Sequence, residues 1–237
     1  PDQPCGRSCA GRARYRSHAV TARFMAAAIK ICGISTPETL DAVLNAQADH
    51  VGFNFFPPSP RHLGLVEASA LAARAASRIS KVGVFVDPDD AALRDAISAA
   101  KLDAVQLHGD ESPARTAAVR AQFGLPVWKV IPVATASDVV RAQAYTDAAD
   151  FILFDAKTPK DAQLPGGMGL RFDWGLLSGI RMSLPWGLAG GLSPTNVAGA
   201  IAATGAPLVD TSSGVESAPG VKDMDKIAAF CKAARSV

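Results

Sequence analysis

Short apolar runs alternate with alanine-rich stretches along the chain from residue 28 onward. Each run is apolar almost without interruption, which is typical of strands buried on both faces of a parallel sheet. The eight runs lie at residues 28–32, 51–55, 81–86, 103–108, 126–131, 151–155, 186–190 and 207–210. We therefore predict eight strands, with a helix in the stretch that follows each strand.

Four of the connecting stretches carry a helix-start signal, in which a capping residue precedes proline. These pairs are Thr36-Pro37, Asp87-Pro88, Ser112-Pro113 and Ser193-Pro194. Eight strand–helix units in about 210 residues are typical of a (β/α)8 barrel. A doubly wound open sheet is the alternative, but it usually has about five or six units and, for dinucleotides, a GxGxxG motif, which this sequence lacks. We predict an α/β fold, a single TIM barrel.

Residues 1–24 differ in composition from the rest of the chain. They carry five arginines and one acidic residue, a net charge of +4, so the remainder contributes −2 to the total of +2. The segment has no apolar period, and we expect a disordered or non-native extension upstream of Met25, with the barrel domain over 25–237. An arginine-rich transit peptide is the alternative. Because the basic charge belongs to this extension, the body gives no reason to expect a nucleic-acid partner.

Cysteine and histidine usage bears on compartment and metals. Four cysteines in 237 residues are too few for a disulfide scaffold, so we expect a reducing, cytoplasmic setting. No stretch approaches about 18 uninterrupted apolar residues, so no membrane span is expected. The four histidines show no paired spacing, and Cys5 and Cys9 have no further ligands nearby, so we expect no metal.

In a (β/α)8 barrel the chemistry lies where strands end and the following loops begin. Two glycine-containing loops follow the last two runs, AGGLSPTNV at 189–197 and DTSSGVE at 210–216. Glycines let the backbone approach a ligand closely, and loops in these positions form the usual phosphate site of this fold. The plain alternative is two tight turns. We predict that a small molecule with a phosphate group binds here.

Reactive side chains end several other predicted strands. Cys32 ends the first and Asp155 the sixth. Alone, such a cysteine is ordinarily a small buried hydrophobe, and such an aspartate serves equally well to fix a loop, but together, on two sides of one phosphate anchor, they indicate proton transfer. Arg61, in a proline-stiffened loop, either clamps a carboxylate with two parallel hydrogen bonds or lies in solvent. His108, at the end of the fourth strand, either hydrogen-bonds in the core or faces the ligand.

Seven segments carry a resemblance to one family. They are KICGI (30–34), SPR (59–61), QLHG (106–109), FD (154–155), FDW (172–174), AGGLSPTNV (189–197) and SSGVESAPGVKD (212–223). In this order and spacing they resemble the phosphoribosylanthranilate isomerases of tryptophan biosynthesis. The resemblance implies a cofactor-free (β/α)8 barrel that converts N-(5-phosphoribosyl)anthranilate to 1-(2-carboxyphenylamino)-1-deoxyribulose 5-phosphate by an Amadori rearrangement.

The resemblance also implies roles for individual residues. Cys32 is expected to be the general base, Asp155 the general acid, and Arg61 the residue that holds the anthranilate carboxylate. The two glycine loops are expected to hold the ribose phosphate through backbone N–H groups, with a histidine and an aspartate in supporting roles. The remaining substrate-binding residues are therefore His108, Gly190, Gly191, Asp210, Ser213 and Gly214.

Two positions depart from the family pattern. Met168 stands in the long connection 156–170 where a small polar residue is common, and Thr211 stands where valine or alanine is more frequent. These departures concern loop closure and packing at the phosphate, and they leave the expected acid and base unchanged. The connection itself is long enough to be a functional lid or a disordered segment.

Three other functions compete with this interpretation. The histidine-pathway isomerase performs the same rearrangement, but it typically has an aspartate where this chain has Cys32. Indole-glycerol-phosphate synthase uses a lysine-centred site and an extra N-terminal helix, which residues 1–24 do not resemble. A non-catalytic sugar-phosphate sensor would keep the phosphate loops without an acid and a base. The sequence favours the phosphoribosylanthranilate isomerase, acting on a small molecule as a monomer or homodimer.

Overall fold

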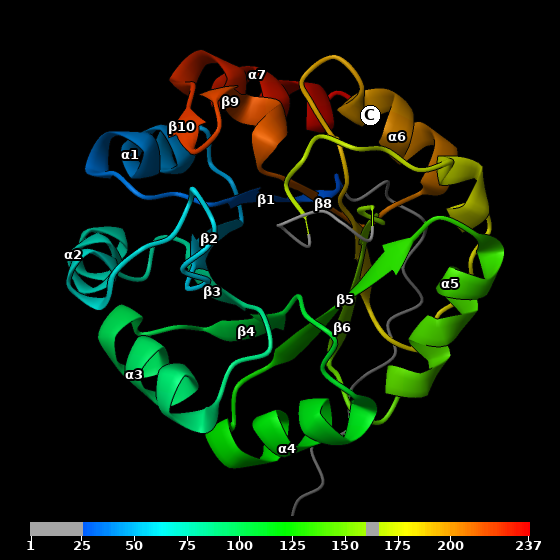
Figure 1. The fold of residues 1–237 in the computed structure, drawn as a ribbon. Coiled ribbons are helices and arrows are strands. Elements are labelled where there is room, and N and C mark those ends of the chain that lie inside the picture. Colours follow the sequence, from blue (N-terminus) through cyan, green and yellow to red (C-terminus); the bar gives the residue numbers. More distant parts are fainter. Residues whose placement is uncertain (1–25, 160–165) are drawn as a thin grey trace, which may run out of the picture.

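Eight parallel strands close into a barrel in chain order, and helices surround it (Figure 1). The structure is a computed structural model, and it describes residues 26–159 and 166–237. The predicted (β/α)8 barrel is confirmed, and the open-sheet alternative is wrong because β1 pairs with both β2 and β8. The strands are β1 (Ala28–Cys32), β2 (His50–Asn54), β3 (Ser80–Phe85), β4 (Ala104–Leu107), β5 (Val127–Val133), β6 (Phe151–Ala156), β7 (Trp186–Leu188) and β8 (Leu208–Thr211).

An α-helix follows every strand except β6, after which the described residues form only a short 3-10 helix. A two-stranded hairpin is added after β8. The helices are α1 (Pro37–Asn45), α2 (Leu65–Ala75), α3 (Asp90–Ala100), α4 (Pro113–Phe123), α5 (Ala136–Arg141), α6 (Val197–Thr204), α7 (Met224–Ala234), and the 3-10 segments η1 (Ala142–Tyr145), η2 (Trp174–Leu177) and η3 (Ser213–Val215); the hairpin is β9 (Glu216–Ala218) and β10 (Val221–Lys222).

Two of the four predicted helix starts are confirmed. α1 and α4 begin at their prolines, and the Thr36 and Ser112 side chains accept backbone N–H groups of the first turn. The missing N–H of a proline is harmless at this position, because the first turn of a helix has no internal acceptor for it.

The other two helix starts are wrong. α3 begins at Asp90 with Asp89 as its cap, because the Asp87 carboxylate instead accepts the Asp110 N–H from the next loop at 2.9 Å. α6 begins only at Val197, because residues 193–196 form a turn in which the Ser193 N–H donates to the Asn196 side chain at 2.8 Å. In both cases the capping side chain has another partner, because the Ser193 hydroxyl pairs with the Thr195 hydroxyl at 3.0 Å.

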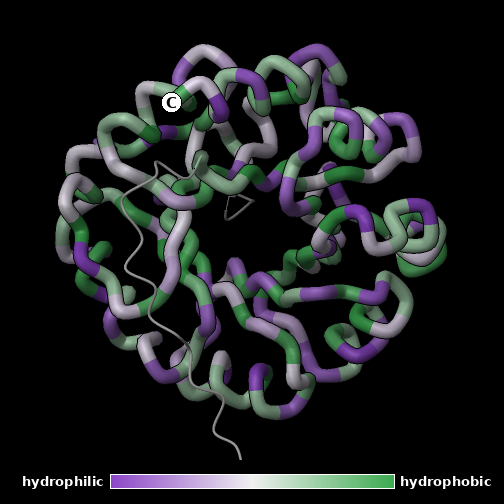
Figure 2. Tube along the Cα trace, turned by 180° about the vertical axis from the view of Figure 1, so that it is seen from behind, coloured by the Kyte–Doolittle hydropathy of each residue, from purple (hydrophilic) through white to green (hydrophobic). Residues whose placement is uncertain are grey.

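Two apolar layers stabilise the barrel. Successive side chains of a strand point to opposite faces, so each strand supplies one layer inside the barrel and another beneath the helices. Val82, Trp128, Leu153 and Leu208 belong to the smaller inner cluster, and a larger cluster joins the strands to the helices. Hydrophobic and hydrophilic residues alternate along the surrounding helices (Figure 2), as expected where one helix face is buried.

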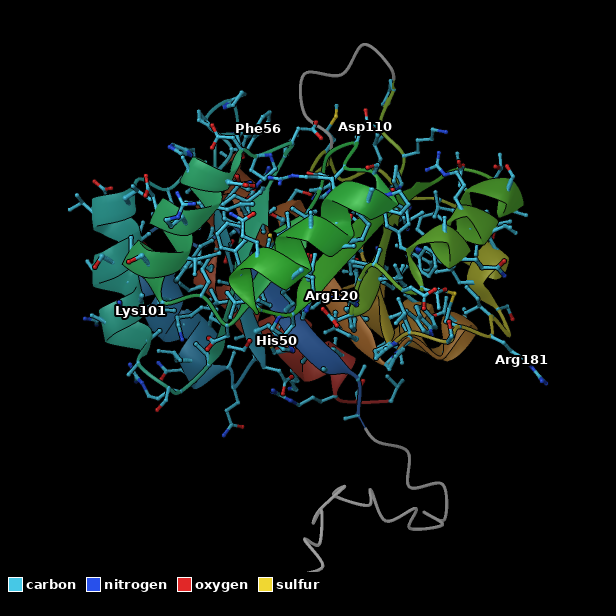
Figure 3. All side chains as sticks on the ribbon, turned by 90° about the horizontal axis from the view of Figure 1, so that it is seen from below. His50, Phe56, Lys101, Asp110, Arg120 and Arg181 are labelled. Atoms are coloured by element: carbon cyan, nitrogen blue, oxygen red, sulfur yellow. The ribbon has the colours of Figure 1, made fainter. Side chains whose placement is uncertain are left out.

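All eight barrel strands run in the same direction, so their carboxyl ends share one rim of the barrel. Phe56 and Asp110, which follow β2 and β4, lie at this rim, whereas His50, which begins β2, lies toward the opposite end (Figure 3). Of the helices in the described part of the chain, none has the length and apolar character needed to cross a membrane. The expectations for residues 1–24 and for part of the 156–170 connection concern residues outside the described ranges.

Candidate active site

A pocket opens at the carboxyl ends of the strands. Its lining comes from the ends of β1, β2, β3, β4, β6 and β8, from the loops that follow β7 and β8, and from the described end of the long connection. All nine residues that the sequence placed at a site line this one pocket: Cys32, Arg61, His108, Asp155, Gly190, Gly191, Asp210, Ser213 and Gly214.

Cys32 is the last residue of β1, and its side chain is 9% exposed at the pocket floor. Gly52 of β2 lies opposite in the sheet, where an added Cβ would come within 2.8 Å of the sulfur. Burial raises the pKa of the Cys32 thiol, and the ammonium groups of Lys30 and Lys222 act in the opposite direction. The pKa of the thiol is raised overall, so the two cations offset only part of the effect of burial on the thiolate.

Asp155 and His108 face each other across the pocket floor. The Asp155 Oδ2 and His108 Nε2 atoms are 3.2 Å apart, and the second carboxylate oxygen accepts the Ala156 N–H at 2.7 Å. The other ring nitrogen of His108 lies 3.4 Å from the Gln106 amide nitrogen. Asp155 is 7% exposed, so its carboxyl group meets a ligand in the pocket rather than bulk solvent. This placement suits a group that exchanges a proton with a bound substrate.

Arg61 is buried and already holds a carboxylate of the protein. Its Nε and Nη2 atoms donate to the two oxygens of Glu216 at 2.7 and 2.8 Å, and Nη2 also donates to the Gly167 carbonyl at 3.0 Å. A guanidinium has five N–H donors, and among the described residues none accepts from Nη1, which keeps both of its own for a ligand. The alternative of a solvated Arg61 is wrong, because the residue is 5% exposed and its guanidinium pairs with both oxygens of Glu216.

The hairpin after β8 supplies residues that the sequence did not reveal. Glu216 accepts from Lys222 Nζ at 2.7 Å as well as from Arg61, and these partners lower its pKa although burial alone would raise it. Lys222 also donates to the carbonyl of Ser212 at 2.9 Å, and the Ser212 hydroxyl donates to the Cys32 carbonyl at 3.1 Å. One signal was available: opposite charges flank a Pro-Gly turn at 219–220, as in a short hairpin.

The glycine loops after β7 and β8 form the wall between Cys32 and Asp155. Gly190 and Gly191 have φ values of +85° and +63°, a left-handed conformation that favours glycine. Thr211, the departure noted in the strand-eight motif, donates to the Leu192 carbonyl at 2.7 Å and so ties the two loops together. The other departure, Met168, is half exposed and lines the pocket.

Replacing Gly214 by alanine is expected to destabilise the phosphate-loop wall. A Cβ there would lie 1.8 Å from the Leu192 carbonyl oxygen, so the backbone must move. We expect a loss of about 1–3 kcal/mol in the free energy of unfolding, measured in urea. Gly199→Ala is the matched control: nothing lies within 4 Å of its added Cβ, and alanine in this helix should stabilise by about 0.5–1 kcal/mol. Equal effects of both substitutions would contradict the close approach.

Known proteins of one family match this chain. The family model described as N-(5'phosphoribosyl)anthranilate (PRA) isomerase matches residues 29–233. The chain belongs to this family. The N-(5'-phosphoribosyl)anthranilate isomerase of Paramagnetospirillum magneticum is 53% identical over 207 residues, which cover 87% of this chain and 96% of the relative. The resemblance inferred from the seven motifs is thereby confirmed.

Solved structures of isomerases from the family have the same fold. The enzyme from Thermotoga maritima matches with a TM-score of 0.80 and 35% identity, covering 89% of this chain and all of that chain. A second structure, an isomerase in complex with reduced 1-(o-carboxyphenylamino)-1-deoxyribulose 5-phosphate, matches with a TM-score of 0.75 and 33% identity, over 89% and 100% of the two chains. Within residues 26–159 and 166–237, no group of three or more His, Cys, Asp or Glu is placed to hold a metal ion.

Proposed function

We propose that this chain isomerises N-(5-phosphoribosyl)anthranilate to 1-(2-carboxyphenylamino)-1-deoxyribulose 5-phosphate in tryptophan biosynthesis. The observation that carries the proposal is the placement of Cys32 and Asp155 in one pocket, at the ends of β1 and β6, with the two glycine loops between them around the ring. Family membership and the complex of a related isomerase with the reduced product support the same substrate.

The reaction is an internal redox rearrangement, so it needs no external oxidant or reductant. Asp155, protonated, gives its proton to the furanose ring oxygen, and the C1′–O bond breaks as the anilino nitrogen forms an iminium. Cys32, as thiolate, then removes the proton from C2′, and the C–H electrons form the enolamine. The enolamine tautomerises to the ketone. An acid and a base must therefore hold opposite protonation states in one pocket.

Two anion-binding sites of the protein would orient the substrate between Cys32 and Asp155. The N–H groups of the loops after β7 and β8 suit the ribose phosphate. Nη1 of Arg61 suits the anthranilate carboxylate, because Glu216 fixes the guanidinium from its other edge. His108 and Asp210 border the same pocket and are assigned supporting roles. Fixing both ends of the substrate contributes to the rate through orientation.

The proposal is tested by adding purified protein to freshly prepared phosphoribosylanthranilate and following the anthranilate fluorescence. We expect rapid loss of the substrate signal. A folded protein that binds phosphate but leaves this signal unchanged would overturn the proposal, and would point to the histidine-pathway substrate or to a non-catalytic barrel.

The proposal places the reaction in the cytoplasm, in keeping with the sparse cysteines, and assigns the protein a monomeric or homodimeric state. The related enzyme from Thermotoga maritima is described as dimeric. Sedimentation equilibrium of the full chain distinguishes the two states.

A further inference from the structure

Lys30 is a fully buried lysine directly beneath the candidate base along β1. It precedes Cys32 by two residues, so both side chains point to the barrel interior. Its exposed fraction is 0%, and it is absent from the pocket lining, so it does not reach a substrate. Its Nζ atom donates to Asp210 Oδ2 at 3.0 Å. Lysine is almost never fully buried unless it is paired, and Asp210 is that partner here. The presence of a buried ion pair inside the barrel still needs a physical reason.

Stability gives little reason for this ion pair. Removing two charges from water is costly, and apolar residues of similar size commonly replace a buried pair without loss of stability. The inner cluster of Val82, Leu153 and Leu208 shows that apolar side chains fill the barrel interior elsewhere. We therefore look for the role of the Lys30–Asp210 pair in its electrostatic effect on the pocket above it.

The charges around Cys32 come from four elements. β1 contributes Lys30, β8 contributes Asp210, β10 contributes Lys222, and the loop after β2 contributes Arg61, whereas β2 itself presents only Gly52. Lys30 and Lys222 lower the pKa of the thiol, and Asp210 raises it. The larger of the two cationic effects on the pKa of the thiol is that of Lys30.

Lys222 and Lys30 differ in the number of hydrogen bonds that their ammonium groups donate. Lys222 Nζ donates to Glu216 at 2.7 Å and to the carbonyl and hydroxyl oxygens of Ser212 at 2.9 and 3.1 Å. Lys30 Nζ donates to Asp210 at 3.0 Å, and hydrogen bonding to the Cys32 side chain also raises the pKa of Lys30. An ammonium group has three N–H donors, so Lys30 keeps donors that can turn to a thiolate above it.

We propose that Lys30, held by its buried pair with Asp210, is a positioning residue that stabilises the anionic form of Cys32, the form that accepts the substrate proton. The inference rests on the proposed function, in which Cys32 is the base. It also gives Asp210 a definite role, because this carboxylate fixes the ammonium group within the barrel. Asp210 also borders the pocket, and its second carboxylate oxygen, Oδ1, has no hydrogen-bond partner among the described residues.

The test is Lys30→Met, which keeps the length of the side chain and removes its charge. The first readout is the pH dependence of Cys32 alkylation by iodoacetamide, followed by mass spectrometry of the Cys32 peptide. Only the thiolate reacts, and the loss of a nearby cation raises the pKa of the thiol. We expect the alkylation curve to move to higher pH by about one unit or more, which means about tenfold slower alkylation at neutral pH.

The second readout is the pH profile of kcat/KM. A thiolate base gives activity that rises as the pH passes through the pKa of Cys32, so raising this pKa moves the acidic limb of the profile to higher pH. We expect the activity of Lys30→Met to recover substantially in alkaline buffer. A lysine with only a structural role would lower the activity equally at every pH and leave the limb in place, which would overturn the inference.

Lys81→Met is the matched control. Lys81 lies on β3, is 5% exposed, and pairs with Asp103 at 2.7 Å, but it does not face Cys32. Its substitution should leave both curves in place, and an equal shift would contradict the proposal. If Lys30→Met fails to fold, the double variant Lys30→Met/Asp210→Asn removes both charges together and should still shift the alkylation curve upward, because the effect of Lys30 on the thiol exceeds that of Asp210.

The two proposals fail in different ways. Full turnover by Cys32→Ala would overturn the proposed base, whereas the alkylation curve reports on Lys30 without any catalysis. An unmoved alkylation curve in folded Lys30→Met, combined with inactive Cys32→Ala, would overturn this inference alone.

Discussion

Replacing Cys32 by alanine is expected to reduce turnover by at least about 10²–10⁴-fold, because the proposed mechanism assigns removal of the C2′ proton to the Cys32 thiolate. Both pocket anchors are separate from Cys32, so KM should change far less than kcat. Initial rates from the anthranilate fluorescence assay give both constants. Cys32→Ser should lose a comparable factor, since a hydroxyl group keeps the size of the thiol without ionising at neutral pH.

The chain offers a matched control for this variant. Cys231 is buried in α7 and lies outside the pocket lining, and burial raises its pKa to about 11. Cys231→Ala therefore removes a thiol of the same kind without removing a base, and its turnover should equal that of the wild type. Near-normal turnover by folded Cys32→Ala would remove Cys32 from the role of base.

The sequence could predict which residues meet because a parallel barrel has a simple geometry. Once eight buried runs are placed in chain order, every strand end falls on the same rim. Cys32 and Asp155 are far apart in sequence, yet this rule alone brings them to one pocket. Strand positions were likewise predicted to within about two residues, since a continuous apolar run marks a strand buried on both faces.

The partners of the charged residues could not be predicted in this way. Arg61 and Glu216 are separated by 155 positions, and their bidentate contact depends on how the hairpin β9–β10 packs against the loop after β2. Lys30 is a charged residue within the apolar run AIKIC, but neither its burial nor its pairing with Asp210 can be predicted from that run. The same holds for Asp87, whose contact with the Asp110 N–H displaced the predicted start of α3.

Asp155→Asn should produce a loss of the same order as that of Cys32→Ala, about 10²–10⁴-fold in kcat. Asparagine keeps the shape of the side chain, but it has no acidic proton to give to the furanose oxygen, so ring opening becomes slow. The substrate should still bind, because the phosphate loops and Arg61 are untouched. Steady-state kinetics on the fluorescent substrate, together with binding of the reduced product analogue by calorimetry, separates these effects.

Asp150→Asn provides the control from the opposite end of the same strand. Asp150 immediately precedes β6, is exposed, and accepts the Val127 N–H at 2.9 Å, a bond that an asparagine oxygen can also accept. Its turnover should be unchanged. Because an acid and a base that act on one substrate are not additive, the double variant Cys32→Ala/Asp155→Asn should be little slower than the slower single variant. Losses that simply multiply would mean that the two groups act independently on one rate-limiting step, which would contradict the assignment of Asp155 to ring opening and of Cys32 to the later proton removal.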